Sequence, residues 1–436
     1  IVIIGNGIAG VNAAAAVRAL CPEAEALILA EDTRPLYSRV RLPEVLSGAA
    51  KPEDITFYKD EWYAKKGIEV RLSSRVESID RASREVLLAD GSRVRYDALI
   101  LATGALANKP PIPGSEAAGV FTMRSMEDTL AIRESLLANP DSASVIGGGL
   151  LGLEAARAIK DSGVREVRVF EIFNRLLPRQ LDETGAALLA ARFSDMGIEI
   201  VCGAETESFI PDAQDPSRAF AIRLKDGRVF KSSTTVLSMG VKPNAELARK
   251  ASLPVARGVV VDELMRAGDE RVFACGDCAE FSGIVWGIIP AALEQAPVAA
   301  RSALAALSLL PAGEERVYAQ TVPKTALKIA GVELMSLGKA VLTAEEERSG
   351  RWVSRSRVWE GGARYEKFVM DTRAPEARAA ANGSGVDVGK AADGGPSDVP
   401  VLAGAILYGS KAHQSAVQAM MGKPVTDAEL DTLLSD

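Results

Sequence analysis

Two glycine-rich segments have the spacing G-x-G-x-x-G, which is typical of a site for the phosphates of a dinucleotide. The glycines of the first segment are Gly5, Gly7 and Gly10, and those of the second are Gly147, Gly149 and Gly152. Glycine lets the backbone approach a pyrophosphate closely, and the N-terminus of the following helix carries the partial positive charge that holds it. We therefore expect a dinucleotide at each segment.

Acidic residues follow both segments after about 20 residues, the distance at which a carboxylate meets the ribose of the adenosine. Glu31 takes this position after the first segment, with Asp32 as the alternative, and Glu171 takes it after the second. A carboxylate repels a 2′-phosphate, so Glu171 favours NADH over NADPH. Arg175 lies close enough in the sequence to weaken this preference.

The residues around each segment predict a strand, a helix and a second strand, which together make a βαβ unit. In the first unit these are Ile1–Ile4, a helix that ends at Leu20, and Ala26–Ala30, and in the second they are Ala143–Ile146, Leu153–Ser162 and Glu166–Phe170. Two such units in one chain indicate two Rossmann-like dinucleotide-binding domains.

The order of the segments predicts that one domain is inserted in the other. Two apolar stretches, Ala98–Gly104 and Val236–Gly240, have the character of crossovers between domains. The first domain would then comprise residues 1–112 and 241–315, and the second would comprise residues 113–240.

The character of the chain changes from about residue 316. The stretches Ala326–Ile329 and Trp352–Val358 alternate like strands, which predicts an antiparallel-sheet interface domain over residues 316–436. A segment rich in Ala, Gly, Asp and Pro, at about 374–400, is expected to be a flexible insertion. The expected fold class is α/β, with an α+β C-terminal domain.

The composition excludes several classes of protein. The 436 residues carry a net charge of −7, so the chain lacks the basic field typical of nucleic-acid binding. No apolar run is long enough for a membrane span, and no signal peptide is visible. Four cysteines are too few for a secreted disulfide scaffold, so we expect a cytoplasmic protein. The cysteines are also too scattered for a four-ligand metal site, so no metal is expected.

A third segment indicates a second kind of cofactor. The apolar stretch Val272–Ala274 leads to Gly276 and Asp277, where the glycine permits close approach and the carboxylate can hydrogen-bond a ribityl hydroxyl. A ribityl chain belongs to a flavin. A flavin and a nicotinamide in one protein make hydride transfer possible.

With these segments the chain resembles the FAD- and NAD-dependent pyridine nucleotide oxidoreductases. The resemblance is strongest to the NADH:rubredoxin reductases and to the flavin module of the NADH-dependent nitrite reductase large subunit. Besides the two fingerprints, the matching pieces are Tyr37–Arg39, Leu42–Gly48, Ala102–Gly104, Gly240–Asn244, Ala274–Glu280 and Pro290–Gln295. They imply that the first fingerprint holds FAD and the second NADH.

The resemblance also implies the residues of each site. Those for FAD are Gly5, Gly7, Gly10, Glu31, Asp32, Arg39, Val76, Thr103, Gly104, Gly276, Asp277 and Pro290. Those for NADH are Gly147, Gly149, Gly152, Glu154, Glu171 and Gly240. The helix that begins near Pro290 would aim its positive end at the flavin. Glu44 and Glu154 are expected near the flavin, with Arg41 to offset their charge, and no side chain is assigned as a certain catalyst.

Thiol chemistry is not expected at the flavin. The disulfide-reductase branch of the superfamily has a redox cysteine after the second strand, but Thr33–Gly48 contains none. Cys275 and Cys278 have the spacing C-x-x-C, and we interpret them as small packing residues beside Gly276 and Asp277, with a redox role as the alternative.

The resemblance implies that NADH reduces the flavin and that the electrons pass to a small carrier such as rubredoxin. Basic residues between 348 and 367 would suit an acidic carrier, and Arg351, Arg355 and Arg357 share one strand face by period two. The alternatives are an NADH-oxidising partner of a nitrite reductase, an NADH oxidase that uses oxygen, and an NADH-binding sensor or scaffold. A homodimer is also possible.

Overall fold

The computed structural model describes residues 1–310, 316–321, 325–329, 331–373 and 399–435. They fall into two compact units, each made of several chain segments. The first unit comprises Ile1–Pro110, Thr122–Glu134 and Met239–Val322, and the second comprises Pro111–Phe121, Ser135–Ser238 and Pro323–Asp436. The predicted flexible insertion lies outside the described residues, apart from its last two.

A six-stranded sheet in the order β19-β20-β7-β1-β2-β3 forms the centre of the first unit. Its strands are β1 (Val2–Ile4), β2 (Ala26–Leu29), β3 (Ile68–Arg71), β7 (Leu99–Leu101), β19 (Arg266–Asp269) and β20 (Val272–Ala274). All neighbours are parallel except β19 and β20. The apolar runs that predicted β1, β2, β7 and β20 are largely buried, as parallel strands require.

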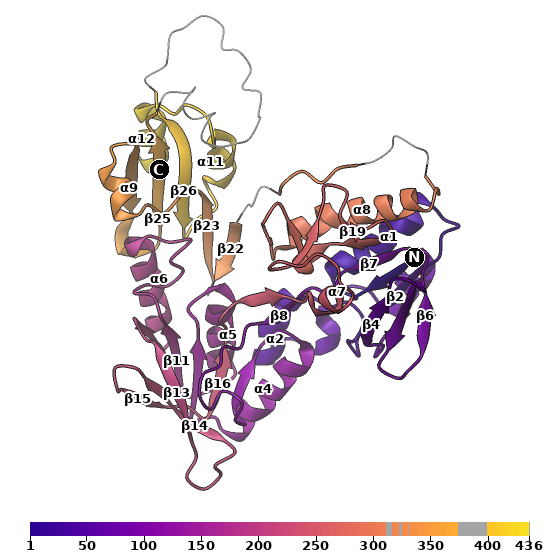
Figure 1. The fold of residues 1–436 in the computed structure, drawn as a ribbon. Coiled ribbons are helices and arrows are strands. Elements are labelled where there is room, and N and C mark those ends of the chain that lie inside the picture. Colours follow the sequence, from indigo (N-terminus) through magenta and orange to yellow (C-terminus); the bar gives the residue numbers. More distant parts are fainter. Residues whose placement is uncertain (311–315, 322–324, 330, 374–398, 436) are drawn as a thin grey trace, which may run out of the picture. The chain divides into compact units, whose positions relative to one another are not determined.

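Helices α1 (Ile8–Leu20) and α8 (Ile289–Ala306) pack against each other and against this sheet. The smaller helices of the unit are α2 (Leu42–Ser47), α3 (Asp60–Lys66) and α7 (Glu246–Lys250), and the first residues of α4 (Met126–Ala138) also belong to it. Three small sheets complete the unit: β4 (Val76–Asp80) with β5 (Glu85–Leu88) and β6 (Arg93–Arg95), β8 (Ala105–Ala107) with β17 (Val241–Pro243), and β18 (Val259–Val261) with β21 (Ala279–Phe281). Figure 1 labels most of these elements.

The second unit repeats the plan with a five-stranded sheet in the order β12-β11-β10-β16-β9. Its strands are β9 (Val120–Thr122), β10 (Ser142–Ile146), β11 (Glu166–Glu171), β12 (Ile198–Cys202) and β16 (Thr234–Leu237). Helices α5 (Leu150–Asp161) and α6 (Glu183–Asp195) pack on it. A three-stranded sheet of β13 (Thr206–Pro211), β14 (Ala219–Leu224) and β15 (Val229–Lys231) follows.

The C-terminal residues form an antiparallel sheet in the order β22-β23-β26-β25-β24. The strands are β22 (Thr325–Ile329), β23 (Val332–Gly338), β24 (Trp352–Val358), β25 (Tyr365–Asp371) and β26 (Val401–Tyr408), and the helices are α9 (Ala344–Arg348), α11 (Gln414–Met420) and α12 (Asp427–Ser435). The sheet has an apolar core of its own around Phe368, Leu402 and Leu407.

The predicted fold class is confirmed, with two mainly parallel sheets and an antiparallel C-terminal sheet. One prediction was wrong in detail: the helix expected at Leu153–Ser162 begins at Leu150, because Gly149 already serves as its N-cap. The predicted limits of the three domains stay a prediction. Within the described residues, no helix is both long and apolar enough to cross a membrane.

Candidate functional site

The first glycine segment joins β1 to α1 in a turn that leaves no room for side chains at two of its three glycines. A Cβ on Gly5 would lie 2.2 Å from the carbonyl oxygen of Ala102, and one on Gly10 would lie 1.9 Å from that of Gly5. Gly5 also has a φ of +113°. A Cβ on Gly7, the N-cap of α1, would have no other atom within 4 Å. The turn is therefore closely packed at Gly5 and Gly10 and open at Gly7, which leaves space for a phosphate.

Two cavities run along this turn and share part of their walls. The larger, of about 610 Å³, has Glu31, Asp32, Ser74, Arg75 and Val76 in its lining. The smaller, of about 280 Å³, is lined by Asn6–Ala9, Gly276, Asp277 and the start of α8. Residues common to both are Gly5, Asp32, Arg39, Thr103, Ala105 and Arg124. The two cavities therefore adjoin along the first glycine segment and form one elongated site.

Most residues predicted for FAD line this elongated site. They are Gly5, Gly7, Glu31, Asp32, Arg39, Val76, Thr103, Gly104, Gly276 and Asp277. Gly10 is packed against the Gly5 carbonyl within the turn. Pro290 lies in the first turn of α8, and its neighbour Ile289 lines the smaller cavity. Glu31 and Asp32 both line the larger cavity, but only Asp32 reaches the smaller one as well. Their individual roles stay predictions.

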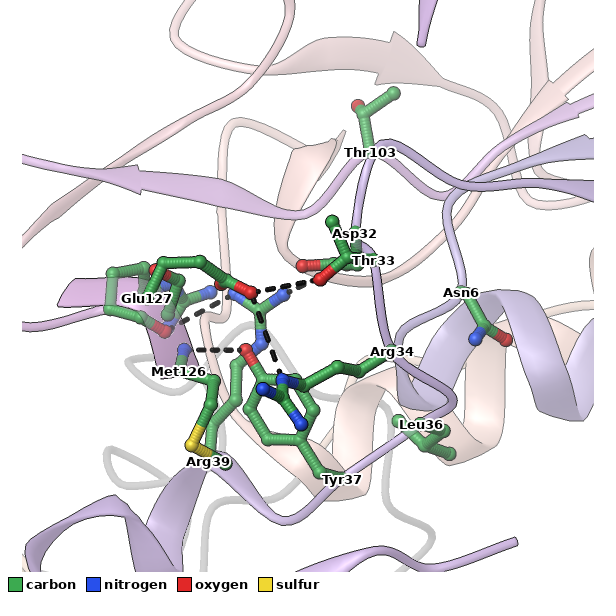
Figure 2. Close-up of polar contacts among 12 residues, drawn as sticks. Asn6, Asp32, Thr33, Arg34, Leu36, Tyr37, Arg39, Thr103, Met126 and Glu127 are labelled. Atoms are coloured by element: carbon green, nitrogen blue, oxygen red, sulfur yellow. Dashed lines mark hydrogen bonds and ion pairs between the residues drawn. The ribbon is translucent and has the colours of Figure 1, made fainter. Parts of the chain in front are cut away.

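Charged side chains hold one side of the site together (Figure 2). Arg39 lies 3.5 Å from the carboxylate of Asp32, and the Thr33 hydroxyl donates to Glu127 at 3.1 Å. The buried hydroxyl of Tyr37 accepts the backbone N–H of Met126, the first residue of α4, at 3.0 Å. Burial raises the pKa of Asp32, and the charge of Arg39 partly opposes this. The loop after β2 is thereby tied to the start of α4.

Arg124 is a site residue that sequence reasoning missed. It lines both cavities, donates from Nε to the carbonyl of Ala105 at 3.2 Å, and pairs with Asp277 through Nη2 at 3.0 Å. It thus places a fixed positive charge where the two cavities meet, which suits a pyrophosphate. It lies just before α4, and no motif or residue spacing in the sequence marks it as a site residue.

A hydrogen bond to a side chain of α8 fixes the loop that carries Asp277. Gly276 has a φ of +79°, and its N–H donates to the buried amide oxygen of Gln295 at 2.8 Å. Cys275 and Cys278 flank the loop, are fully buried and are not joined in a disulfide. Burial raises the pKa of both thiols. Among the described residues that line the two cavities, none is a cysteine.

The second glycine segment joins β10 to α5 in a turn with the same features. A Cβ on Gly152 would lie 2.0 Å from the Gly147 carbonyl oxygen, whereas Gly149 meets no atom within 4 Å. Within the described residues, neither α1 nor α5 has a side-chain N-cap or an acid in its first turn. The N–H groups that begin both helices are therefore left for an anion.

Glu171 ends β11 beside this turn and is buried. Its two carboxylate oxygens accept the N–H groups of Gly148 at 2.6 Å and of Phe173 at 2.9 Å. Arg175, the residue expected to weaken the preference for NADH, instead donates to the carbonyl oxygens of Leu181 and Pro178. Its guanidinium is therefore engaged by the backbone, which favours NADH.

The remaining predicted residues belong to different units. Glu154 belongs to α5 in the second unit, whereas Gly240 and Glu44 belong to the first. Glu44 pairs with Arg41 at 2.7 Å, as expected, and this hydrogen bond lowers the pKa of the carboxyl. Glu44 is therefore ionised at neutral pH. The closeness of Glu44 and Glu154 to a flavin stays a prediction.

The arginines predicted for docking have partners within the chain. Arg351 precedes β24 and pairs with Asp371 at 3.0 Å, and Arg355 pairs with Asp427 and Asp431 of α12. Arg357 donates to the carbonyl of Leu434 near the end of the same helix. Arg355 and Arg357 thus hold α12 against β24. No cluster of metal-ligating side chains occurs among the residues that the structure describes.

A family model described as pyridine nucleotide-disulphide oxidoreductase matches residues 1–303. The chain belongs to this family. Members of the pyridine nucleotide-disulphide oxidoreductase family that it matches are flavoproteins that use FAD and NADH, so the predicted cofactors and enzyme class are confirmed.

Two curated relatives illustrate the range of the family. The assimilatory nitrate reductase electron transfer subunit of Bacillus subtilis (strain 168) is 34% identical over 350 residues, which are 80% of this chain and 43% of that protein. The NADH-rubredoxin oxidoreductase of Clostridium acetobutylicum is 32% identical over 338 residues, which are 78% of this chain and 81% of that protein. The chain therefore spans less than half the length of the first relative and most of the second.

Solved structures show the same fold. The NAD-dependent persulfide reductase from A. fulgidus matches with a TM-score of 0.77 and 26% identity, over 96% of this chain and 77% of that one. The NADH:rubredoxin oxidoreductase from Clostridium acetobutylicum matches with a TM-score of 0.73 and 25% identity, over all of this chain and 98% of that one.

Proposed function

We propose that this chain transfers electrons from NADH, through FAD, to a small redox carrier such as rubredoxin. FAD supplies the chemistry that converts the two-electron hydride of NADH into single electrons. The elongated site along the first glycine segment is the observation that carries the proposal, because it brings the glycine turn, Arg124 and Asp277 together. The domain limits given above, 1–112 with 241–315 for FAD and 113–240 for NADH, form part of the proposal.

The protein would hold FAD mainly by backbone and fixed charge. The open N-terminus of α1 and the guanidinium of Arg124 would bind the pyrophosphate, and Glu31 or Asp32 would bind the ribose. Asp277 would accept from the ribityl chain. The N-terminus of α8, next to the smaller cavity, would favour negative charge on the reduced flavin.

An external acceptor fits the absence of cysteine from the described lining of the two cavities. Without a thiol beside the flavin, electrons leave to another molecule. The relatives named for rubredoxin support a protein carrier. The relatives named for nitrate and nitrite reduction and for NADH oxidation support the alternatives, which are an NADH-oxidising partner of a nitrite reductase and an NADH oxidase that uses oxygen.

Two matched variants test which segment holds which cofactor. Gly7 and Gly149 have ordinary backbone angles and open space around them, so aspartate can replace either without collision. Each aspartate puts a negative charge where a pyrophosphate would bind. We expect Gly7→Asp to be purified without flavin. We expect Gly149→Asp to retain flavin that NADH no longer bleaches in a stopped-flow experiment. The opposite pattern would reverse the assignment of the two segments.

The acceptor is tested by mixing the NADH-reduced protein with oxidised rubredoxin, ferredoxin or air. Reoxidation by rubredoxin much faster than by air supports the carrier reductase. Reoxidation by air alone supports the oxidase, and failure of NADH to bleach the flavin supports a sensor or scaffold. Docking at Arg351, Arg355 and Arg357 predicts that Arg351→Gln slows the carrier reaction and weakens its dependence on salt. A cytoplasmic location and a homodimer stay predictions.

A further inference from the structure

Asn6, within the first glycine segment, and Tyr63 form a buried pair of polar side chains. Asn6 is 4% exposed, and its amide oxygen accepts a hydrogen bond from the hydroxyl of Tyr63 at 3.2 Å. The hydroxyl oxygen of Tyr63, a residue of α3, in turn accepts the backbone N–H of Leu36 at 3.4 Å. The hydroxyl thus accepts from Leu36 and donates its single proton to Asn6, so the amide of Asn6 presents its oxygen to Tyr63.

The amide nitrogen of Asn6 is left without a partner. Its Nδ2 is buried and makes no hydrogen bond within the described part of the chain. Asn6 lines the smaller cavity, and Figure 2 shows its side chain apart from the dashed contacts among the other residues. A buried N–H donor without an acceptor is costly, so this group points to an acceptor supplied from outside the chain.

We infer that Asn6 donates a hydrogen bond from Nδ2 to a pyrophosphate oxygen of FAD, and that Tyr63 positions it. The inference rests on the proposed FAD site. The acceptor is assigned as a phosphate because Asn6 immediately precedes Gly7, the uncapped N-terminus of α1, where an anion is favoured. The donor adds to the backbone N–H groups of that turn, and α3 contributes to cofactor binding without reaching the cavity.

The affinity of the apoprotein for FAD tests this role, measured by quenching of flavin fluorescence on titration. Asn6→Asp keeps the shape of the side chain but replaces the donor by a carboxylate that repels phosphate. We expect the Kd for FAD to rise about 10- to 100-fold, as for loss of a hydrogen bond to a charged group. Asn12→Asp is the matched control. Asn12 lies on α1, the helix that follows Asn6, and its Nδ2 donates to the Ile8 carbonyl, so we expect a change below threefold.

Tyr63→Phe separates the positioning role from simple packing. It should raise the Kd about threefold to tenfold in the wild-type background and leave it unchanged in an Asn6→Ala background, because the hydroxyl acts only through the amide. Equal effects in both backgrounds would overturn the positioning role. An Asn6→Asp protein that binds FAD as tightly as the wild type would overturn the inference. If the wild-type apoprotein itself does not bind FAD, the proposed function fails instead.

Discussion

Asp182 holds the C-terminal sheet to the second dinucleotide fold. Its side chain caps α6 by accepting the N–H of Gly185 at 3.0 Å. The same carboxylate accepts the hydroxyl of Tyr365 at 2.6 Å and pairs with the ammonium of Lys367 at 3.0 Å, both residues of β25. The Lys367 side chain is only 8% exposed. One carboxylate therefore joins a helix end to a buried cation of another sheet.

Replacing Asp182 by alanine removes all three interactions. Loss of a helix N-cap costs about 1 kcal/mol, and a buried ion pair that loses one partner costs about 3–5 kcal/mol because the other charge is left unpaired. These terms share one group and do not add fully. We expect Asp182→Ala to destabilise the junction by about 3–5 kcal/mol. Asp182→Asn keeps the cap but not the charge, so it should lose somewhat less.

Hydrogen exchange, read peptide by peptide, measures this local stability. At neutral pH, amides of β25 and the first turn of α6 should exchange about 150- to 5,000-fold faster in Asp182→Ala than in the wild type. Glu183→Gln is the control, because it removes a neighbouring exposed carboxylate from the same helix end and should cost less than about 1 kcal/mol. If Asp182→Asn behaves like Glu183→Gln, the ion pair contributes nothing and the reasoning is refuted.

The effect should also depend on pH. Burial by itself would raise the pKa of Asp182, but the hydrogen bonds from Tyr365, Gly185 and Lys367 outweigh it, so the pKa lies below its ordinary value of 3.8. A lowered pKa in the folded state stabilises the protein above the unfolded pKa, and this stability is lost as the pH falls through the folded pKa. The difference between the wild type and Asp182→Asn should therefore be full near pH 6 and disappear in strong acid.

Three further predictions follow from single contacts. Glu171→Gln has one acceptor for two backbone N–H groups, so it should raise the Kd for NADH about tenfold and reduce the preference over NADPH, measured by the rate of flavin bleaching. Cys275 and Cys278 are buried with raised pKa values, so a thiol reagent should label them only after unfolding; labelling of the native protein would restore the redox interpretation. Thr426→Ala should cost α12 about 1 kcal/mol, because the hydroxyl caps Glu429, and circular dichroism of the thermal transition would show it.

The sequence was sufficient for the elements that carry the two cofactors. Short apolar runs that lead into glycine turns predicted β1, β10 and β20, and each of these strands lies within one residue of its expected limits. The strand β7 lies inside the predicted stretch Ala98–Gly104 and ends three residues before that stretch does. These signals are local, because a buried parallel strand and a tight turn are set by neighbouring residues. The antiparallel strands β22 and β24 were found in the same way, from alternation.

The polar contacts of the site could not be predicted in this way. Arg124 meets Asp277, Asn6 meets Tyr63, and Gln295 meets Gly276, and in each pair the partners are far apart in the sequence. No spacing rule connects such residues, since only the completed sheet brings them together. Type and spacing therefore identify the backbone cradle, whereas the side chains that complete it are identified by burial and by unpaired donors.

The basic segment around β24 shows why a local count of charge does not define a docking surface. The segment 348–367 has six basic residues and two acidic ones, but Arg351 and Arg355 pair with acids that lie outside it. Arg355 lies 2.9 Å from Asp431 and 3.3 Å from Asp427, both on a helix that follows much later. Pairing lowers the positive electrostatic potential that an acidic carrier would meet. If Arg355 binds a carrier, it must break its ion pairs with α12. Arg355→Gln should therefore destabilise α12 in the free protein, whereas a residue used only for docking would leave that helix unchanged.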